Sequence, residues 1–465
     1  MSHGTAFSSG LQSIGHADQP APNPAHFPEK PASSQSYWIR NFAIDLDAQY
    51  QSVSIPEEVD VVIVGSGITG ATVVHQLAQK RPDLRVALFE ARGICTGATG
   101  RNGGHICRPE VYNIRELLHH YDAEDALRMR QMVLRNRDML LDCIDELKAA
   151  DDVDLRLNGT IVVFETAEER KEYELDIEFA AAYGHAHEGT ILSAEEVIKK
   201  VGIAHAEHGA AFLEKSGTLY PRKFVNLLLR NAIQRMPTLS IHPFTPVTSV
   251  SKQESSSHPY TVNSEKGAVR SRAIFHATNG YAKHLISELN GIDGVYGCKA
   301  HMLGVQPDNG PSAPQLETGF GYADFWHWVQ QTPNKGPFLY GLAKAEYLHD
   351  YDDTRTIPDE DPIKKEMVEF LESTFPRWFT ESSAKDRIMY DWTGIQGFTA
   401  NGASIVGRPV KGSPGEFVSV GHNGEGMARC FACATVATDV MLGYLDETRT
   451  AVPDWFPKAY WRDVA

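Results

Sequence analysis

The sequence lacks the features that mark several large classes of protein. Its six cysteines are few for 465 residues and irregularly spaced, which argues against a disulfide framework and predicts reduced thiols. The 44 lysines and arginines are outnumbered by 60 aspartates and glutamates, for a formal net charge of -16. Because a surface of this sign does not attract the phosphates of nucleic acids or of anionic membranes, we expect neither as a partner.

Long apolar runs and the catalytic signatures of other classes are missing too. No stretch approaches about 18 uninterrupted apolar residues, and residues 1–35 lack the basic-then-apolar pattern of a secretory signal. There is no Gly-x-Ser-x-Gly elbow for acyl transfer, and the histidines lack companion ligands at the spacing that zinc requires. Cys430 and Cys433 have CxxC spacing but lie in a segment of small apolar residues, so they are predicted to be core thiols. We expect a soluble, cytoplasmic protein without a metal ion.

The composition that remains is that of an ordinary globular protein, 42% hydrophobic and 22% charged. At roughly 150 residues per domain, the length allows two or three domains. Residues 1–52 are interpreted as an N-terminal arm, because prolines interrupt its first part. Its aromatic pair, Tyr37 and Trp38, can dock on the body of the protein. Residues 451–465 are interpreted as a C-terminal tail.

A strand, a glycine-rich turn, a helix and a second strand follow the arm. The β-branched run at residues 59–64 has the composition of a parallel strand buried on both faces. The turn at residues 65–70 leads into a helical pattern at 71–80, and an apolar run at 86–89 completes a βαβ unit. Further short strands are predicted at residues 160–164, 241–250, 260–263 and 273–277.

The turn carries the pattern Gly65-x-Gly67-x-x-Gly70, which in this context predicts a dinucleotide site. The first glycine permits the tight turn, the second lets a pyrophosphate approach the backbone, and the third lets helix and strand pack closely. Glu90 stands 20 residues after Gly70, where its carboxylate can accept hydrogen bonds from an adenosine ribose. This pattern alone leaves both NAD and FAD open.

A second glycine-rich segment, residues 96–105, favours FAD. It reads Thr-Gly-Ala-Thr-Gly-Arg-Asn-Gly-Gly-His and contains too much glycine for a regular element. A flexible surface turn would explain this composition. The alternative, which we favour, is a loop whose backbone amides line the ribityl chain and ring of a flavin.

Together with later segments, these motifs resemble the FAD-dependent amine and amino-acid oxidoreductases of the D-amino-acid oxidase and glycine oxidase type. The later segments are residues 216–224, 277–281, 392–407 and 421–427, and the resemblance covers roughly residues 56–445. The early glycine loop is most similar to that of gamma-glutamylputrescine oxidoreductases, which favours an amine substrate.

The resemblance implies an α/β fold with two discontinuous domains. A Rossmann-like FAD-binding domain is predicted from residues 53–115, 214–290 and 398–450. An α+β substrate domain with a mixed sheet is predicted from residues 116–213 and 291–397.

The resemblance also implies bound FAD, and departures from the family predict that FAD is held noncovalently. Gly394 stands near the position where relatives with a cysteinyl flavin carry the cysteine. Arg101 and Asn102 stand where others carry the linking histidine, and His105 comes too late. A further departure is Asn401, where many relatives carry aspartate.

The predicted FAD contacts come from the glycine turn, the acid, the glycine loop, the adenine side and the C-terminal segment. In the family this last segment contacts the N1 and C2 oxygen edge of the ring, and glycines before a helix form a nest of amide donors suited to that edge. The full set is Gly65, Gly67, Ile68, Thr69, Gly70, Glu90, Ala91, Arg92, Thr99, Gly100, Arg101, Asn102, Gly103, Gly104, His105, Val247, Ala277, Thr278, Asn279, Gly394, Gly424, Glu425, Gly426 and Met427.

The implied reaction is hydride transfer to flavin N5 from the carbon that bears an amine. Water hydrolyses the imine, and dioxygen or another acceptor reoxidises the flavin. Because the cofactor carries the chemistry, no obligatory acid-base pair is expected. The catalytic candidates are His105 at the reacting side of the ring, Trp392 as a pocket wall, and Lys344 as a cation that aids oxygen reduction. A surface position is the alternative for Lys344.

The substrate is a small amine or an amino acid. An aromatic band is interpreted either as a pocket wall for an alkyl or cationic amine or as sheet core. Its members are Trp326, Trp328, Phe338 and Tyr340. An α-amino acid would need an arginine for its carboxylate, and Arg108 and Arg222 are the candidates.

Two other functions stay open at this point. A flavin-binding protein that has lost catalysis and acts as a binding or assembly partner would account for the arm and for Asn401. An NAD-dependent dehydrogenase would account for the first glycine motif alone.

Overall fold

The computed structural model describes most of the chain. The described residues are 34–109, 113–253, 256–291, 293–310, 312–343, 354, 356 and 358–464. The catalytic candidate Lys344 and residues 1–33 of the predicted arm lie outside them.

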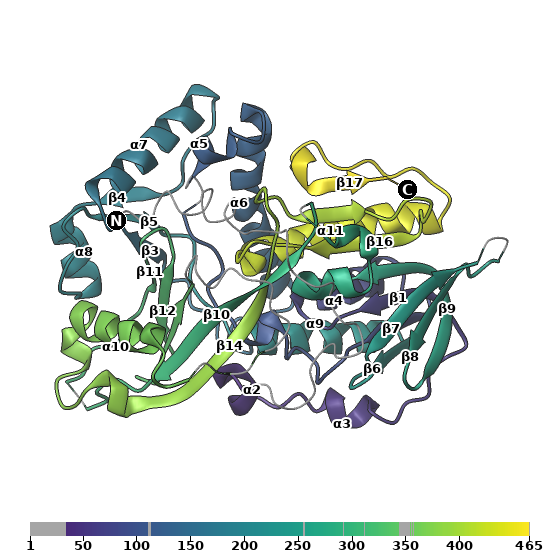
Figure 1. Cartoon of the computed structure of the whole chain (residues 1–465), viewed down its shortest axis with the longest axis horizontal. Helices are drawn as coiled ribbons and strands as arrows, with labels where there is room; N and C mark the ends of the chain where they lie inside the picture. The colour runs from purple at the N-terminus through teal and green to yellow at the C-terminus, as the bar shows by residue number, and fades with distance from the viewer. Residues whose placement is uncertain are drawn as a thin grey trace.

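The chain is organised around two mixed sheets, which occupy the right and left halves of Figure 1. The first has nine strands among the described residues, in the order β17-β15-β16-β9-β1-β2-β6, with β8 and β7 continuing from β9 as antiparallel strands. Its strands are β1 (Glu58–Val64), β2 (Val86–Phe89), β6 (Leu239–His242), β7 (Val247–Lys252), β8 (Tyr260–Ser264), β9 (Gly267–His276), β15 (Ile405–Arg408), β16 (Glu416–Val420) and β17 (Trp461–Asp463).

The second sheet has eight strands in the described part, in the order β14-β10-β13-β12-β11-β3-β5-β4. The long antiparallel pair of β10 and β14 runs from the left half to the junction of the two sheets in Figure 1. The strands are β3 (Thr160–Val163), β4 (Thr190–Leu192), β5 (Ala210–Leu213), β10 (Tyr296–Val305), β11 (Gly319–Tyr322), β12 (His327–Gln331), β13 (Phe338–Leu342) and β14 (Ile388–Phe398).

Both faces of β1 are buried, as its β-branched sequence predicts. Val61 and Ile63 face a helical layer, whereas Val62 and Val64 face the apolar side of the β7–β8 hairpin. β1 pairs in parallel with β2 and with β9, so the predicted βαβ unit is at the centre of the first sheet. The helical layer consists of α4 (Ile68–Lys80), α6 (Ala123–Glu146), α9 (Pro221–Arg235) and α11 (Gly426–Leu445).

Shorter or peripheral helices complete the structure. α10 packs its apolar face on the second sheet. These elements are α2 (Tyr37–Asn41), α3 (Leu46–Tyr50), α5 (Ile114–Leu117), α7 (Ala167–Ala182), α8 (Ala194–Val201), α10 (Pro362–Thr374) and the 3-10 turns η3 (Ala98–Gly100), η4 (Asn279–His284), η5 (Ser287–Leu289), η7 (Pro376–Trp378), η8 (Ala384–Arg387) and η9 (Lys458–Tyr460).

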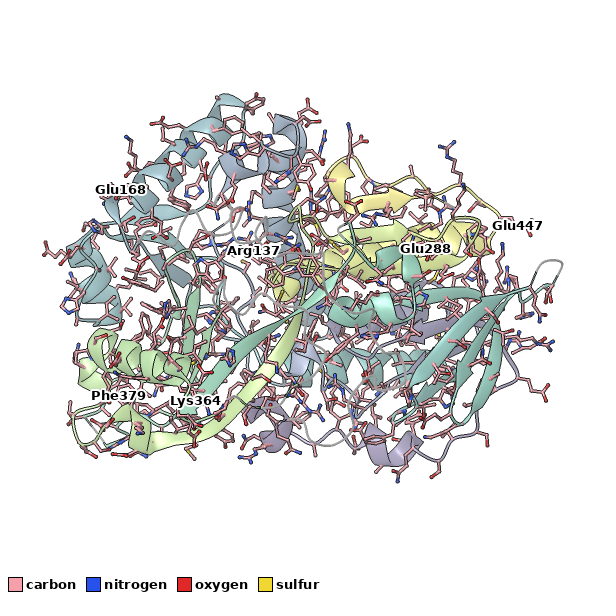
Figure 2. All side chains as sticks on the ribbon, viewed as in Figure 1. Arg137, Glu168, Glu288, Lys364, Phe379 and Glu447 are labelled. Carbon is pink, nitrogen blue, oxygen red and sulfur yellow. The ribbon has the colours of Figure 1, made fainter. Side chains whose placement is uncertain are left out.

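α11 is the core helix that its small apolar residues predict. It is long and apolar enough to cross a membrane by length and composition, but 78% of its apolar window is buried against the rest of the protein. Cys430 and Cys433 are buried in it as free thiols. Its neighbour α6 carries Arg137, labelled in Figure 2, whose buried guanidinium forms ion pairs with Asp138 at 2.8 Å and Glu188 at 2.7 Å.

Two local predictions need correction. The single strand expected at residues 241–250 is two strands, because Pro243 and Pro246 interrupt the backbone donors between β6 and β7. Residues 451–465 are more than a tail, since β17 pairs in parallel with β15 and Tyr460 is fully buried.

Candidate cofactor and substrate site

A cavity of about 720 Å³ lies where the two sheets meet. From the first sheet it is lined by the C-terminal ends of β1 and β2 and the turn after β9, and from the second by residues of β10, β12 and β14. Of the predicted cofactor residues, all line this cavity except Gly70 and Gly100. The fold therefore gathers the predicted residues around one space, while their contacts with FAD stay a prediction.

The glycine turn after β1 has the close contacts that its sequence predicts. Gly65 adopts a φ of +104°, and a Cβ there would lie 2.6 Å from the carbonyl oxygen of Ala277. A Cβ on Gly70 would lie 1.9 Å from the carbonyl oxygen of Gly65. Thr99 Oγ1 accepts a hydrogen bond of 3.0 Å from the Ile68 amide, the first residue of α4. The turn, α4 and the glycine loop thus form one packed unit.

Glu90 is fixed at the cavity wall by backbone donors. Its carboxylate accepts hydrogen bonds from the Ser66 amide at 3.0 Å, the Ser66 hydroxyl at 2.6 Å and the Arg92 amide at 3.0 Å. Among the described residues, the buried Arg92 Nε and Thr278 Oγ1 have no hydrogen-bond partner, and both residues line the cavity. An anchored carboxylate, a glycine turn and unpaired polar atoms suit the ribose and phosphates of an ADP group.

The glycine loop, residues 96–105, is held by three buried side chains from different parts of the chain. Trp392 Nε1 on β14 donates to the Arg101 carbonyl at 2.8 Å, and Trp38 Nε1 on α2 donates to the Asn102 carbonyl at 2.7 Å. Gln330 on β12 donates to the next carbonyl, that of Gly103. The loop is therefore not a flexible surface turn.

Trp392 does not form the pocket wall that was expected. Its side chain is fully buried and does not line the cavity, because its indole packs behind the glycine loop and bonds to the loop backbone. Trp392 can therefore act on the cavity only through the loop.

His105 and Arg101 line the cavity in different electrostatic states. Burial, assisted by nearby Arg156, lowers the pKa of His105 to about 3, so its ring is neutral at physiological pH. Neither ring nitrogen has a hydrogen-bond partner in the described part of the chain. Arg101 donates to the Thr96 carbonyl at 2.7 Å and to the Thr393 carbonyl at 3.0 Å, and burial lowers its pKa to about 9. Arg101 is thus partly engaged by backbone, whereas both ring nitrogens of His105 are buried without a hydrogen-bond partner among the described residues.

The segment before α11 presents backbone to the cavity. Gly421, Asn423 and Gly424 have positive φ angles of 69°, 51° and 77°, and the cavity is lined by Gly424 to Met427 at the start of the helix. Asn423 Oδ1 accepts a 2.9 Å hydrogen bond from the Thr399 amide, which fixes the segment. The amides of Gly421, Asn423 and Glu425 are bonded within the protein, so the expected nest of amide donors stays a prediction.

An arginine cluster at the cavity wall, Arg108, Arg130 and Arg429, surrounds Glu425. Arg108 pairs with Glu425 at 2.9 Å and with Asp324, Arg130 lies 3.7 Å from Glu425, and Arg429 also pairs with Glu425. All five residues line the cavity. Burial and the charge of Arg108 lower the pKa of Arg130 to about 10. Among the described residues, the carboxylates paired with these three guanidinium groups are those of Glu425 and Asp324.

Of these three arginines, the sequence predicted only Arg108 as a candidate to bind a substrate carboxylate. The other candidate for a substrate carboxylate, Arg222, is wrong, because it is buried behind the site and donates to the carbonyls of Phe42, Ile94 and Cys95. Arg130 and Arg429 lie on α6 and α11, and their sequence context gives no sign that they meet.

A strained turn brings aromatic side chains to the cavity. Ala323, Asp324 and Phe325, between β11 and β12, are three consecutive non-glycine residues with positive φ. The turn is held through Asp324, whose amide donates to Glu169 at 2.7 Å and whose carboxylate binds Arg108. It places Phe325 at 5.2 Å, edge to face, from the ring of His105.

The predicted aromatic band divides between pocket and core. Trp326 and Trp328 line the cavity. Phe338 and Tyr340 do not, because they are fully buried under α10 in the core of the second sheet. Among the described residues, no group of three or more His, Cys, Asp or Glu side chains is arranged to hold a metal ion.

Comparisons with known proteins give a family match over most of the chain. The family model described as DAO, FAD dependent oxidoreductase, matches residues 60–440. The Haemophilus influenzae protein named "Probable oxidoreductase OrdL" is 20% identical over 420 residues, which are 89% of this chain and 90% of that protein.

Solved structures share the fold. Glycine oxidase from Geobacillus kaustophilus has a TM-score of 0.64 at 18% identity, covering 86% of this chain and 98% of its own. L-proline dehydrogenase from P. horikoshii has a TM-score of 0.68 at 17% identity, covering 87% and 98%. The predicted fold class is confirmed by these matches.

The close approach at Gly70 gives the first testable prediction. Gly70→Ala would press a methyl group on the Gly65 carbonyl, so we expect a loss of about 3 kcal/mol in the free energy of unfolding. Gly310→Ala is the control, because nothing lies within 4 Å of a Cβ there. Urea titrations measure the free energy of unfolding of both variants. Equal transition midpoints for the two variants would contradict the close contact between Gly70 and the Gly65 carbonyl.

The strained turn gives a pH prediction. Burial and nearby Asp324 raise the pKa of Glu169 from 4.5 to about 7. The folded protein then keeps a proton that the unfolded chain has lost, so this group makes the free energy of unfolding fall as pH rises from 4.5 to 7. We expect Glu169→Gln to flatten that fall by about 2 kcal/mol in urea titrations at several pH values. The control is Glu168→Gln, because Glu168, labelled in Figure 2, is exposed on α7. This variant should keep the wild-type dependence of the free energy of unfolding on pH. If Glu169→Gln shows the same pH dependence as this control, the raised pKa of Glu169 is contradicted.

Proposed function

Because this chain belongs to the DAO family of FAD-dependent oxidoreductases, we propose that it oxidises a carbon–nitrogen bond of a small amine or amino acid. FAD is held noncovalently in the cavity between the two sheets, and dioxygen takes up the electrons. The family match supports FAD as the cofactor and the broader class of FAD-dependent oxidoreductase. The bond, the substrate and the acceptor are the proposal.

The observation that carries the proposal is the continuity of the cavity. It extends from the glycine turn and Glu90 to Trp326 and Trp328 on the second sheet. The glycine turn and Glu90 would hold the ADP half of FAD, and the glycine loop and the segment before α11 would hold its ring. When bound, FAD would supply a hydride acceptor for the substrate carbon, and water would hydrolyse the imine product.

The chain itself supplies position, shelter and charge. Phe325, Trp326 and Trp328 provide apolar surface that excludes water from the reacting carbon. Neutral His105 can hydrogen-bond the substrate without carrying charge. The positive guanidinium groups at the cavity wall disfavour an ammonium ion near them, which favours the neutral, oxidisable form of the amine.

The same cluster favours an amino acid over a simple amine. Arg130 Nε and Arg429 Nε are buried and have no hydrogen-bond partner among the described residues. A substrate carboxylate would pair with the guanidinium groups that line the cavity. Glycine oxidase and L-proline dehydrogenase, which share this fold, are named for amino-acid substrates. The similarity of the glycine loop to gamma-glutamylputrescine oxidoreductases stays a prediction.

An inactive flavin-binding protein was the alternative function, supported by the N-terminal arm and by Asn401. The structure gives Asn401 another explanation. Asn401 Oδ1 accepts a hydrogen bond of 3.2 Å from the Ala403 amide, a turn contact that an aspartate would also make. Asparagine here therefore does not indicate a lost catalytic group.

Anaerobic mixing tests the proposed reaction. The FAD-loaded protein is mixed with a panel of neutral amines and of glycine, proline and other amino acids of both hands. We expect an amino acid to bleach the flavin absorbance, and air to restore it with formation of hydrogen peroxide. Bleaching by no member of the panel would contradict the proposal, and restoration without peroxide would contradict the dioxygen step.

Substitution of Arg130 tests the substrate class. Arg130→Met keeps the stem and removes the charge, so we expect the KM for the amino acid to rise roughly 10- to 100-fold, with KM for a neutral amine little changed. The matched control is Arg135→Met on the same helix, because Arg135 is exposed and lies over Trp455. An unchanged KM for the amino acid would exclude Arg130 as part of the carboxylate site.

A further inference from the structure

The end of the predicted N-terminal arm lies directly against the glycine loop. Trp38 is 3% exposed, and its indole donates to the Asn102 carbonyl at 2.7 Å. Ser36, also buried, donates from its hydroxyl to the Gly100 carbonyl at 2.5 Å. We call Ser36 and Trp38 the N-terminal clamp.

The clamp is itself fastened to the body of the protein. The Tyr220 hydroxyl donates to the Trp38 carbonyl at 2.8 Å, and the two rings are 4.5 Å apart, edge to face. Arg222 donates to the Phe42 carbonyl at 2.9 Å. α2 therefore occupies a fixed place below the junction of the two sheets in Figure 1.

Ser34 extends these contacts to the second sheet. Its hydroxyl accepts a 3.1 Å hydrogen bond from the Thr393 amide of β14 and a 3.4 Å hydrogen bond from the guanidinium of Arg101. The same hydroxyl donates to the Thr354 carbonyl at 2.5 Å. The arm thus contacts both the glycine loop and the adjacent strand β14.

From these contacts we infer that Trp38 and Ser36 are positioning residues for FAD, which act through the glycine loop. Neither lines the cavity, so neither touches the cofactor directly. The loop is rich in glycine and would lose much conformational freedom on binding FAD, and bonds that fix its carbonyls beforehand reduce that cost. Both residues precede the stretch 60–440 that matches the family model, so that match assigns them no role.

The inference rests on the proposed place of FAD in the cavity and not on the substrate. It is tested by titrating apoprotein with FAD in a calorimeter, without substrate, and by recording the flavin spectrum. Failure of the proposed oxidation would therefore leave the outcome of this test unaffected.

Trp38→Phe keeps an aromatic ring against Tyr220 and removes the indole donor. We expect the Kd for FAD to rise roughly tenfold and the flavin band to shift, because a buried carbonyl loses its partner. The matched control is Trp378→Phe, a buried tryptophan whose indole has no hydrogen-bond partner among the described residues and which packs in the core of the second sheet. It should leave Kd and spectrum unchanged.

Ser36→Ala provides a second, milder variant that decides the matter if Trp38→Phe does not fold. We expect its Kd to rise roughly threefold. Its control is Ser193→Ala, because Ser36 and Ser193 are the N-caps of α2 and α8, but the Ser193 hydroxyl bonds to Glu196 and not to the glycine loop. The inference is overturned if the clamp variants and their controls bind FAD with the same Kd and give the same spectrum.

Discussion

The rest of the site depends on three hydrogen bonds to one short stretch of backbone. The carbonyls of Arg101, Asn102 and Gly103 are each bonded by a buried side chain, from Trp392, Trp38 and Gln330. Each bond contributes about 1 kcal/mol net, but an unbonded buried carbonyl would cost about 1–3 kcal/mol, so the three favour one conformation of the loop strongly. A glycine-rich segment thereby becomes a fixed wall, whose other side lines the cavity. The two sheets and the arm are joined at this wall.

A network of charged side chains lies at the other end of the cavity. Arg108, Arg130 and Arg429 share two carboxylates, those of Glu425 and Asp324. Burial makes such charges costly unless carboxylates pair with them. Asp324 also belongs to the strained turn that brings Phe325 to the cavity, so the charge cluster and the apolar wall are mechanically connected. This connection explains why a turn with three left-handed residues persists next to the site.

Local sequence patterns predicted the nucleotide half of the site because its chemistry is local. The glycines, α4 and Glu90 lie within one βαβ unit, and each has a steric or hydrogen-bonding reason that is visible in sequence. The substrate half depends on contacts over long sequence separations. Arg130 and Arg429 come together only when α6 packs on α11. Phe338 packs in the core beneath α10, whereas Trp328 lines the cavity. Periodicity shows that a residue is buried but not against what.

The same limit explains the tryptophans. The sequence predicted that Trp38 docks the arm on the body of the protein and that Trp392 forms a pocket wall. In the structure, each indole nitrogen donates to a carbonyl of the glycine loop, which is far away in sequence. Hydrogen bonds from side chain to distant backbone leave no spacing pattern, because the partner is a carbonyl that every residue has. For this reason the sequence pointed to the glycine loop, whose residues line the cavity, but not to the side chains that hold it.

The most direct test of the account is a crystal structure of the protein with FAD bound. The account predicts adenosine ribose hydroxyls within hydrogen-bond distance of the Glu90 carboxylate. It also predicts the flavin ring between the glycine loop and the Gly424 to Met427 segment, with one face toward Trp326 and Trp328. FAD bound at another place, or a ring turned away from the second sheet, would contradict it.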